Sequence, residues 1–463
     1  MIKKQIYIYD STLRDGAQTK GVDFSVSDKI AIAKMLDDLG IDYIEGGWPG
    51  ANNTDTEFFK NSPRLKNSKL VSFGMTYKNS SVLKKNFNEI KKRFKSRNLC
   101  IVGKTWDFQV NKALNITEKE NLNIIKKNIQ VAKNYFDEVL FDAEHFFDGF
   151  KSKKQYALEC IKCAYASGAR WVVLCDTNGG TLPYEIEEIV KETSLYIPTN
   201  NLGIHCHNDT DNAVANTIAA VRSGVRQVQG TFNGLGERCG NTNLTSIIPT
   251  LILKMHLKTS ISKKKLRDLT KVSKFINERL LRKNNPSMPY VGESAFAHKG
   301  GLHASGVKKH SKTYEHIEPE IVGNKRSIII SNQSGKSSLS IKLKELGFNV
   351  NKNKLDYLII NRRYHHFDKP TNYFAYSDKC RCFMCDSVKS ALVHSNMKNS
   401  KIKFKNIYKG LYYSWVNNLW SNWMPRNNEL YYHFPYGRGP YGSYGIINTR
   451  LMGSLRIGVT DEL

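Results

Sequence analysis

The sequence has 463 residues, and 40% of them are apolar, so the chain can bury the core of one large domain and one or two smaller ones. Lysine and arginine outnumber aspartate and glutamate by 70 to 42, a formal net charge of +28. The basic residues are spread along the chain without a block or an arginine-rich arm, so we do not expect a nucleic-acid-binding protein. The positive field would still attract anionic substrates.

The cysteines and the first residues point to the compartment. Nine cysteines are present, without the density or regular spacing of a disulfide scaffold, which favours a reducing cytoplasm. Residues 1–9 are too short and too polar for a signal peptide, and no apolar run approaches roughly 18 residues. We therefore expect a cytoplasmic protein that does not bind to a membrane.

The first strand is expected at residues 5–9, and it ends abruptly in a polar turn that places opposite charges side by side. Residues 25–28 carry helix-starting side chains, and apolar residues then recur at helical spacing until Gly40, which can end the helix. A second strand follows at residues 42–45. The chain therefore opens with a strand, a helix and a strand.

The same strand-then-helix unit recurs six more times. Eight alternating units over about 250 residues predict an α/β fold of the (β/α)8 TIM barrel type. The alternative is an open doubly wound sheet, which usually has fewer strands and a glycine-rich phosphate turn after the first strand; that turn is missing here. The six further strands are expected at residues 70–75, 99–103, 138–142, 170–175, 202–206 and 227–232.

Polar residues gather where these predicted strands end. A barrel of this type carries its chemistry at the carboxyl ends of its strands. Any one of these residues, taken alone, is more simply explained as a capping or loop residue, but eight strand ends with six polar clusters favour a site. The clusters are Asp10, Arg14 and Asp15; Glu45; Glu144; Asp176 and Thr177; His205 and His207; and Asn233 and Glu237.

Two histidines one residue apart stand out among these clusters. In an extended strand, His205 and His207 lie on the same side, while Cys206 faces the other way. Two converging imidazoles can bind a divalent cation. The alternative for an isolated His-x-His pair is one histidine in the core and one at the surface.

The sequence resembles the metal-dependent acyl-CoA aldol and Claisen enzymes that include the 2-isopropylmalate, homocitrate and citramalate synthases. Segments at residues 24–52, 103–108 and 141–150 most resemble the citramalate synthase branch. The resemblance covers about residues 4–342. It rests on four dispersed motifs in the order of the family: STLRDGAQ at 11–18, GIHCHNDTDNAVANT at 203–217, NGLGERCGN at 233–241 and HKGGLHASGV at 298–307.

The resemblance divides the chain into three parts. Residues 1–255 correspond to the catalytic barrel, and residues 256–342 to a helical barrel-flanking linker region that contributes to the active site. Residues 343–463 form an atypical carboxyl-terminal segment that does not resemble the regulatory domain of the family, so the resemblance implies no feedback inhibition through it.

The resemblance implies a metal site and a reaction. The implied ligands of a divalent metal are Asp15, His205, His207 and Asn241; carboxylate and amide oxygens with imidazole nitrogens suit Mn²⁺, Mg²⁺, Co²⁺ or Zn²⁺. The implied activity is that of an (R)-citramalate synthase, an acyltransferase that condenses pyruvate with acetyl-CoA and hydrolyses the thioester in isoleucine (branched-chain amino acid) biosynthesis. The alternatives are a 2-isopropylmalate or homocitrate synthase acting on a longer 2-oxo acid, and a related acyl-CoA lyase.

The resemblance also implies roles for single residues. Arg14 would bind the substrate and stabilise the alkoxide formed as the new bond closes; its structural alternative is a salt bridge with Asp15 or Glu45. Thr177 would hydrogen-bond the carboxylate of the oxo acid. Two acidic residues that help to orient substrate and protons would be Glu144 and Glu237.

The base that deprotonates the acetyl methyl group matches His303, with Tyr314 as its partner and His298 as a competitor. His303 lies outside the predicted barrel, and in the dimers of the family such a segment reaches the site of a neighbouring subunit. A homodimer is therefore expected.

Three further segments contain possible motifs. Residues 334–338, SGKSS, lack the first glycine of a phosphate-binding loop, since that position is Ile330. The cluster Cys380, Cys382 and Cys385 has no second ligand pair at zinc-site spacing. The aromatic residues after residue 410 leave open a non-enzyme alternative, a basic RNA-associated protein that stacks bases on them.

Overall fold

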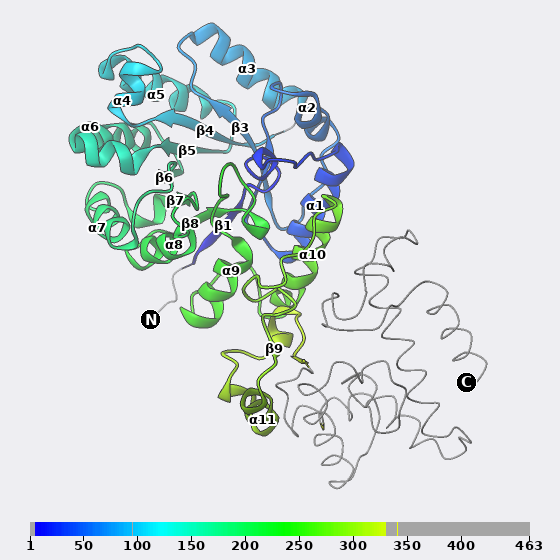
Figure 1. The fold of residues 1–463 in the computed structure, drawn as a ribbon. Coiled ribbons are helices and arrows are strands. Elements are labelled where there is room, and N and C mark those ends of the chain that lie inside the picture. The colour runs from blue at the N-terminus through cyan, green and yellow to red at the C-terminus, as the bar shows by residue number, and fades with distance from the viewer. Residues whose placement is uncertain (1–4, 95, 330–339, 341–463) are drawn as a thin grey trace, which may run out of the picture. The chain divides into compact units, whose positions relative to one another are not determined.

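The computed structural model describes residues 5–94, 96–329 and 340. Eight parallel strands close into a barrel in the order of the sequence, and β1 pairs with β8 to complete the ring (Figure 1). The (β/α)8 prediction is therefore confirmed. The strands are β1 Tyr7–Asp10, β2 Tyr43–Gly47, β3 Lys69–Met75, β4 Asn98–Lys104, β5 Glu138–Glu144, β6 Trp171–Asp176, β7 Leu202–Cys206 and β8 Gln227–Gly230.

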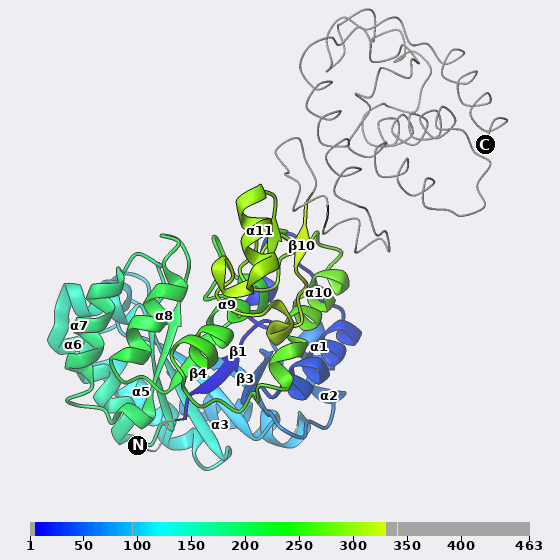
Figure 2. The same cartoon turned by 90° about the horizontal axis from the view of Figure 1, so that it is seen from below.

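The helices that follow the strands lie around the outside of the ring, as both views show (Figures 1 and 2). Short 3-10 turns include η1 Gly16–Gln18 and η3 Phe232–Gly234, and Thr250–Lys254 is a π-helical turn. The α-helices of this part are α1 Val26–Leu39, α2 Asn53–Lys60, α3 Ser80–Arg93, α4 Asp107–Lys112, α5 Glu118–Ala132, α6 Phe146–Ala166, α7 Pro183–Thr193, α8 Ala213–Arg222, α9 Leu244–Pro249 and α10 Leu269–Arg279.

Helix α1 shows how the sequence sets the ends of these helices. Ser25 accepts the backbone N–H of Asp28 at 3.1 Å, and the Asp28 carboxylate accepts the backbone N–H of Ser25 at 3.1 Å. This reciprocal capping satisfies two donors that the first turn leaves free. The helix ends at Gly40, whose φ of 99° is in the left-handed region that glycine adopts without steric cost.

Alternate residues of the strands point into the barrel. The core cluster there includes Tyr9, Tyr43, Phe73 and Trp171, and the indole N–H of Trp171 donates to the Tyr43 hydroxyl at 3.1 Å. Large side chains at alternate positions fill the ring, as expected of a packed barrel interior. Towards the carboxyl ends of the strands, the same alternation brings polar side chains inward instead.

The last strand is shorter than the predicted range 227–232. Strand β8 ends at Gly230, because the backbone N–H of Phe232 turns to the Thr12 hydroxyl at 2.9 Å and Asn233 adopts a φ of 59°. An ideal Cβ on Gly230 would lie 2.4 Å from the carbonyl oxygen of Thr242, so a larger residue would clash where the chain leaves the strand. The turn links the loop after β8 to the loop after β1.

The chain divides into two compact units. The first comprises Met1–Ala295 and Pro319–Lys325, and the second begins with Phe296–Glu318 and resumes at Arg326. Within the second unit, β9 (Ala297–His298) pairs in parallel with β10 (Ser327–Ile328), and α11 covers Gly301–Lys309.

The segment at 343–463, the motif at 334–338 and the three cysteines at 380–385 lie outside the described residues. In the part of the chain that the structure describes, none of the helices combines the length and the apolar character needed to cross a membrane.

Candidate metal centre and active site

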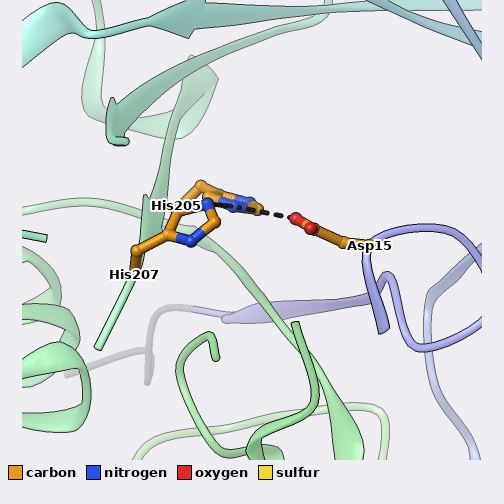
Figure 3. Close-up of side chains that lie close together, drawn as sticks. All are labelled: Asp15, His205 and His207. Atoms are coloured by element: carbon orange, nitrogen blue, oxygen red, sulfur yellow. Dashed lines mark hydrogen bonds and ion pairs between the residues drawn. The ribbon is translucent and has the colours of Figure 1, made fainter. Parts of the chain in front are cut away.

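Three predicted metal ligands converge at the carboxyl end of the barrel (Figure 3). His205 is on β7, His207 follows that strand, and Asp15 is in the loop after β1. The Nε2 atom of His205 lies 3.3 Å from Oδ2 of Asp15 and 3.4 Å from Nε2 of His207. One ligand atom from each of the three buried residues lies within 4.8 Å of the other two.

Asn241, the fourth predicted ligand, adjoins this group. Its Nδ2 atom lies 2.8 Å from Oδ2 of Asp15 and 3.1 Å from Nε2 of His205. An ideal Cβ on Gly236 would lie 2.0 Å from Oδ1 of Asn241, so only glycine leaves room for this amide. The structure therefore brings all four residues together, from three separate loops and one strand.

The residues present fit a divalent cation. Nδ1 of His207 and Oδ1 of Asn241 are buried and have no hydrogen-bond partner among the described residues. Two imidazole nitrogens and a carboxylate oxygen face one another, and such an electron-rich group is stable when a cation lies between them. Rotation of the Asn241 amide by half a turn would present its oxygen to the same point.

The electrostatics of Asp15 and His207 agree with this. Burial alone would raise the pKa of Asp15, but Arg14 and the histidines outweigh it and hold that pKa below its ordinary range. Burial and the neighbouring His205 lower the pKa of His207 to about 3. His207 is therefore a neutral imidazole and Asp15 an ionised carboxylate, which are the forms that bind metals.

Arg14 lies beside the ligand group and is held by two acidic residues and an aromatic ring. Its Nε donates to Oε2 of Glu45 at 2.8 Å, and its Nη2 lies 3.6 Å from Oδ2 of Asp15. The guanidinium lies 4.2 Å from the centre of the Phe73 ring. Arg14 therefore forms the salt bridges that were its structural alternative. These contacts orient its guanidinium at the edge of the site.

A cavity of about 830 Å³ opens over this group within the barrel unit. Thr177 accepts the backbone N–H of His145 at 2.9 Å, and Glu144 forms an ion pair with Lys104 at 2.5 Å. Glu237 has an exposed side chain at the wall. The predicted site residues that line the cavity are Arg14, Asp15, Glu144, Thr177, His205, His207 and Glu237.

Three of the polar residues at strand ends are structural. Asp10 accepts hydrogen bonds from the backbone and hydroxyl of Thr12, and Asp176 accepts the Thr181 hydroxyl at 2.8 Å. Asn233 donates to the backbone carbonyl of Ser273 at 2.9 Å in α10. The contacts of these three residues are therefore those of loop and capping groups, which was the simpler interpretation.

The predicted base and its partner lie in the second unit and contact each other there. The rings of His303 and Tyr314 stack with centroids 3.9 Å apart at 20°, and both side chains are exposed. The competitor, His298, is buried and lies 3.0 Å from Oε1 of Glu315, which also pairs with Arg326. His298 is therefore hydrogen-bonded to a carboxylate that Arg326 already pairs, whereas the ring of His303 is accessible.

Three polar residues of the site region were not among the predicted residues. They are Lys104, the partner of Glu144, and Asp142 and Gln229, which lie behind His205. A signal for them is present in the sequence, because each occupies an inward position of its strand. Asp142 lies two residues before Glu144 on β5, and Lys104 on β4 is in register with Glu144. A polar side chain at an inward position of a buried strand needs a partner inside the barrel.

Comparisons with known proteins match two successive parts of the chain. The HMGL-like family model matches residues 5–276, and the homocitrate synthase post-HMGL domain-like model matches residues 290–365. The chain is 52% identical to the (R)-citramalate synthase of Aquifex aeolicus, covering 75% of this chain and 66% of that protein. It is 44% identical to the (R)-citramalate synthase of Sulfolobus acidocaldarius, covering 76% and 68%.

A more distant relative is the 2-isopropylmalate synthase of Methanocaldococcus jannaschii, at 36% identity over 76% of this chain and 65% of that protein. The matched region thus spans about two thirds of the length of these relatives.

Solved structures agree with the barrel. Hydroxymethylglutaryl-CoA lyase from Pseudomonas aeruginosa superimposes with a TM-score of 0.53 at 18% sequence identity, covering 62% of this chain and 96% of that one. The HMG-CoA lyase from Brucella melitensis gives a TM-score of 0.52 at 18% identity, covering 61% and 100%. At this identity the likeness concerns the fold alone. From the family models and the relatives together, the chain belongs to the HMGL-like family, in the citramalate synthase branch of the 2-isopropylmalate and homocitrate synthases.

Proposed function

We propose that this chain is an (R)-citramalate synthase, which joins the methyl carbon of acetyl-CoA to the oxo carbon of pyruvate and then hydrolyses the thioester. The observation that carries the proposal is the convergence of Asp15, His205 and His207 beside Arg14 at the floor of one cavity. The proposal is supported by relatives of that name at 52% and 44% identity. The product would serve isoleucine biosynthesis.

The proposed metal ligands are Asp15, His205, His207 and Asn241. Mn²⁺, Mg²⁺, Co²⁺ and Zn²⁺ all suit a set of oxygen and imidazole donors. When bound, the cation would act as a Lewis acid that polarises the oxo group of the substrate.

The side chains around the ligand group supply binding and charge. As the new carbon–carbon bond forms, the oxo oxygen gains the electron pair of its π bond, and Arg14 would neutralise this charge from the position that Glu45 fixes. The Thr177 hydroxyl would donate a hydrogen bond to the carboxylate of pyruvate while its oxygen still accepts the backbone N–H of His145. Glu144 and Glu237 would orient the substrate and the proton that finally converts the alkoxide to a hydroxyl group.

The first step removes a proton from the acetyl methyl group, and His303 is the proposed base. The accessible ring of His303 can take that proton, and the stacked Tyr314 ring limits the orientations that the imidazole adopts. Water then attacks the thioester carbonyl, the carbon–sulfur bond breaks, and the thiol of CoA leaves. We propose that the active form is a homodimer, in which His303 serves the site of the neighbouring subunit.

The proposal extends to the parts of the chain and to the compartment. Residues 1–255 would be the catalytic barrel, and residues 256–342 a linker region that contributes to the site. The six cysteines in the described residues are free, which supports a reducing cytoplasm.

The deciding experiment measures thiol release from acetyl-CoA when different 2-oxo acids are supplied in turn. Pyruvate should give the highest kcat/KM, and 2-oxobutyrate, 2-oxoisovalerate and 2-oxoglutarate should give lower values. A preference for 2-oxoisovalerate would identify a 2-isopropylmalate synthase, and one for 2-oxoglutarate a homocitrate synthase. Cleavage of a 3-hydroxyacyl-CoA without any condensation would indicate a lyase.

A further inference from the structure

A hydrogen-bonded chain runs from the candidate metal centre into the interior of the barrel. Gln229, on β8, lies between His205 on β7 and Asp142 on β5. Its Oε1 atom is 2.9 Å from Nδ1 of His205, and its Nε2 atom is 3.1 Å from Oδ1 of Asp142. All three residues are buried, with relative exposures of 0% for Gln229 and 4% for each of the others.

The chemistry of these groups fixes the direction of each hydrogen bond. Oδ1 of Asp142 lies against Nε2 of Gln229 and accepts from it, and a carboxylate oxygen can only accept. The side-chain oxygen Oε1 of Gln227, 3.5 Å from the same nitrogen, is a second acceptor there. The oxygen of the Gln229 amide must then face His205, and because that oxygen cannot donate, Nδ1 of His205 carries the proton.

The consequence reaches the metal ligands. A neutral imidazole with its proton on Nδ1 has its lone pair on Nε2. Nε2 is the atom of His205 that faces Asp15 and His207. The opposite orientation of the Gln229 amide would place a donor against Nδ1, favour the proton on Nε2, and direct that proton into the ligand group.

We propose that Gln229 and Asp142 are positioning residues that fix the tautomer and the ring orientation of His205, and thereby set the affinity of the site for a divalent cation. This inference rests on the proposed metal site. Residues behind a metal-binding histidine typically change metal affinity by about 10- to 100-fold when they are removed.

The first test observes the tautomer directly in the metal-free full-length protein. Nitrogen-15 NMR of the histidine rings at alkaline pH should show the proton of His205 on Nδ1, with the His205→Ala variant identifying its signals. In Gln229→Met, which keeps the volume and removes the amide, the preference should weaken or reverse. A His205 proton found on Nε2 in the unaltered protein would overturn the inference.

The second test measures the dissociation constant for Mn²⁺ by titration calorimetry of the full chain. Gln229→Met should weaken binding about 10- to 100-fold. The control is Asn128→Leu, which removes another fully buried amide whose hydrogen bonds go to the backbone of Tyr77 and Ile124, away from the ligand group, and it should leave the constant nearly unchanged. Equal effects of the two substitutions would mean that Gln229 acts only through packing.

A double variant that exchanges the carboxylate and the amide between positions 142 and 229 distinguishes a loss of positioning from misfolding. Asp142→Asn alone gives the amide of Gln229 a neighbour that can donate or accept, so its orientation is no longer fixed and Mn²⁺ binding should weaken. The double variant Asp142→Asn, Gln229→Glu again places a donor against residue 229 and an acceptor against His205, and it should recover most of the affinity. Failure to recover in a folded double variant would contradict the inference.

The outcomes separate this inference from the proposed metal site. If His205→Ala binds Mn²⁺ as tightly as the unaltered protein, the metal site itself is wrong. If His205→Ala abolishes binding while Gln229→Met does not change it, the site stands and the positioning role of Gln229 is wrong.

Discussion

The guanidinium Nε of Arg14 lies 2.8 Å from Oε2 of Glu45, and this pair joins the loop after β1 to strand β2. Glu45 is fully buried, whereas the side chain of Arg14 is 15% exposed and faces the cavity. Burial raises the pKa of Glu45, and Arg14 opposes that shift. The carboxylate therefore holds the arginine in place while leaving the rest of its planar group available.

Substitution Arg14→Lys should lower kcat about 100-fold, the loss typical of removing one charge-stabilising donor from an active site. Lysine keeps the charge but lacks the planar group that bonds Glu45 and stacks on Phe73. Steady-state kinetics with pyruvate and acetyl-CoA measures the effect. An increase in KM at unchanged kcat would instead assign Arg14 to ground-state binding.

Substitution His207→Ala should remove bound metal and activity together, because it deletes one of the converging nitrogens. Metal content after dialysis, measured by atomic spectroscopy, checks this beside the rate of thiol release. The control is Cys206→Ala: Cys206 is the adjacent buried residue, and strand geometry directs its side chain to the opposite face. Its metal content should match the unaltered protein, and a full metal complement in His207→Ala would exclude His207 as a ligand.

Substitution Lys29→Met should lower the free energy of unfolding by about 3 kcal/mol, the cost of leaving one partner of a buried ion pair without the other. Lys29 is 2% exposed, and its ammonium donates to the Asp55 carboxylate and, at 3.0 Å, to the backbone carbonyl of Gly46. Urea unfolding followed by fluorescence gives the value. The exposed pair Lys60–Glu57 is the control, and Lys60→Met should change stability by less than about 1 kcal/mol.

The pH dependence of stability should contain a contribution from Asp10. Burial raises the pKa of Asp10 from 3.8 to about 7, despite the hydrogen bonds from Thr12. The folded state therefore keeps a proton that the unfolded state loses, so this contribution is complete below about pH 4 and is lost as the pH rises towards about 7. Relative to Asp10→Asn, which does not titrate there, the unaltered protein should lose on the order of 4 kcal/mol across that interval.

Urea unfolding of both proteins at several pH values provides the comparison. A stability difference between them that stays constant from acid to neutral pH would show that Asp10 ionises normally in the fold.

The barrel was predictable because its signals are local. Apolar strands and amphipathic helices alternate with regular spacing, and Gly40 and Ser25 mark the ends of a helix within a few residues of it. The position of the polar residues at the strand ends then followed from the architecture. The resemblance to a family added which of those residues lie together, and the four expected ligands do.

The contacts inside the barrel were not predictable in this way. Asp142 and Gln229 are 87 residues apart in sequence, and only the closed ring brings their side chains to hydrogen-bonding distance. The same local signals also assign to the site residues that do not belong to it. Asn233 stands at a strand end like the site residues, yet its side chain bonds α10, because its left-handed backbone turns it away from the cavity.

The pairing of β1 with β8 has a consequence for the synthesis of the chain. Asp15 is translated near the beginning of synthesis, and His205 and His207 are translated about 190 residues later. Asn241 is translated only after the last strand of the ring. In a nascent polypeptide that ends before β8, β1 can pair with β2 but its other edge has no partner, so the ring stays open and the first three ligands lack the geometry that joins them. An incomplete barrel should therefore bind the cation no more than weakly, and tight cation binding would indicate that the ring has closed.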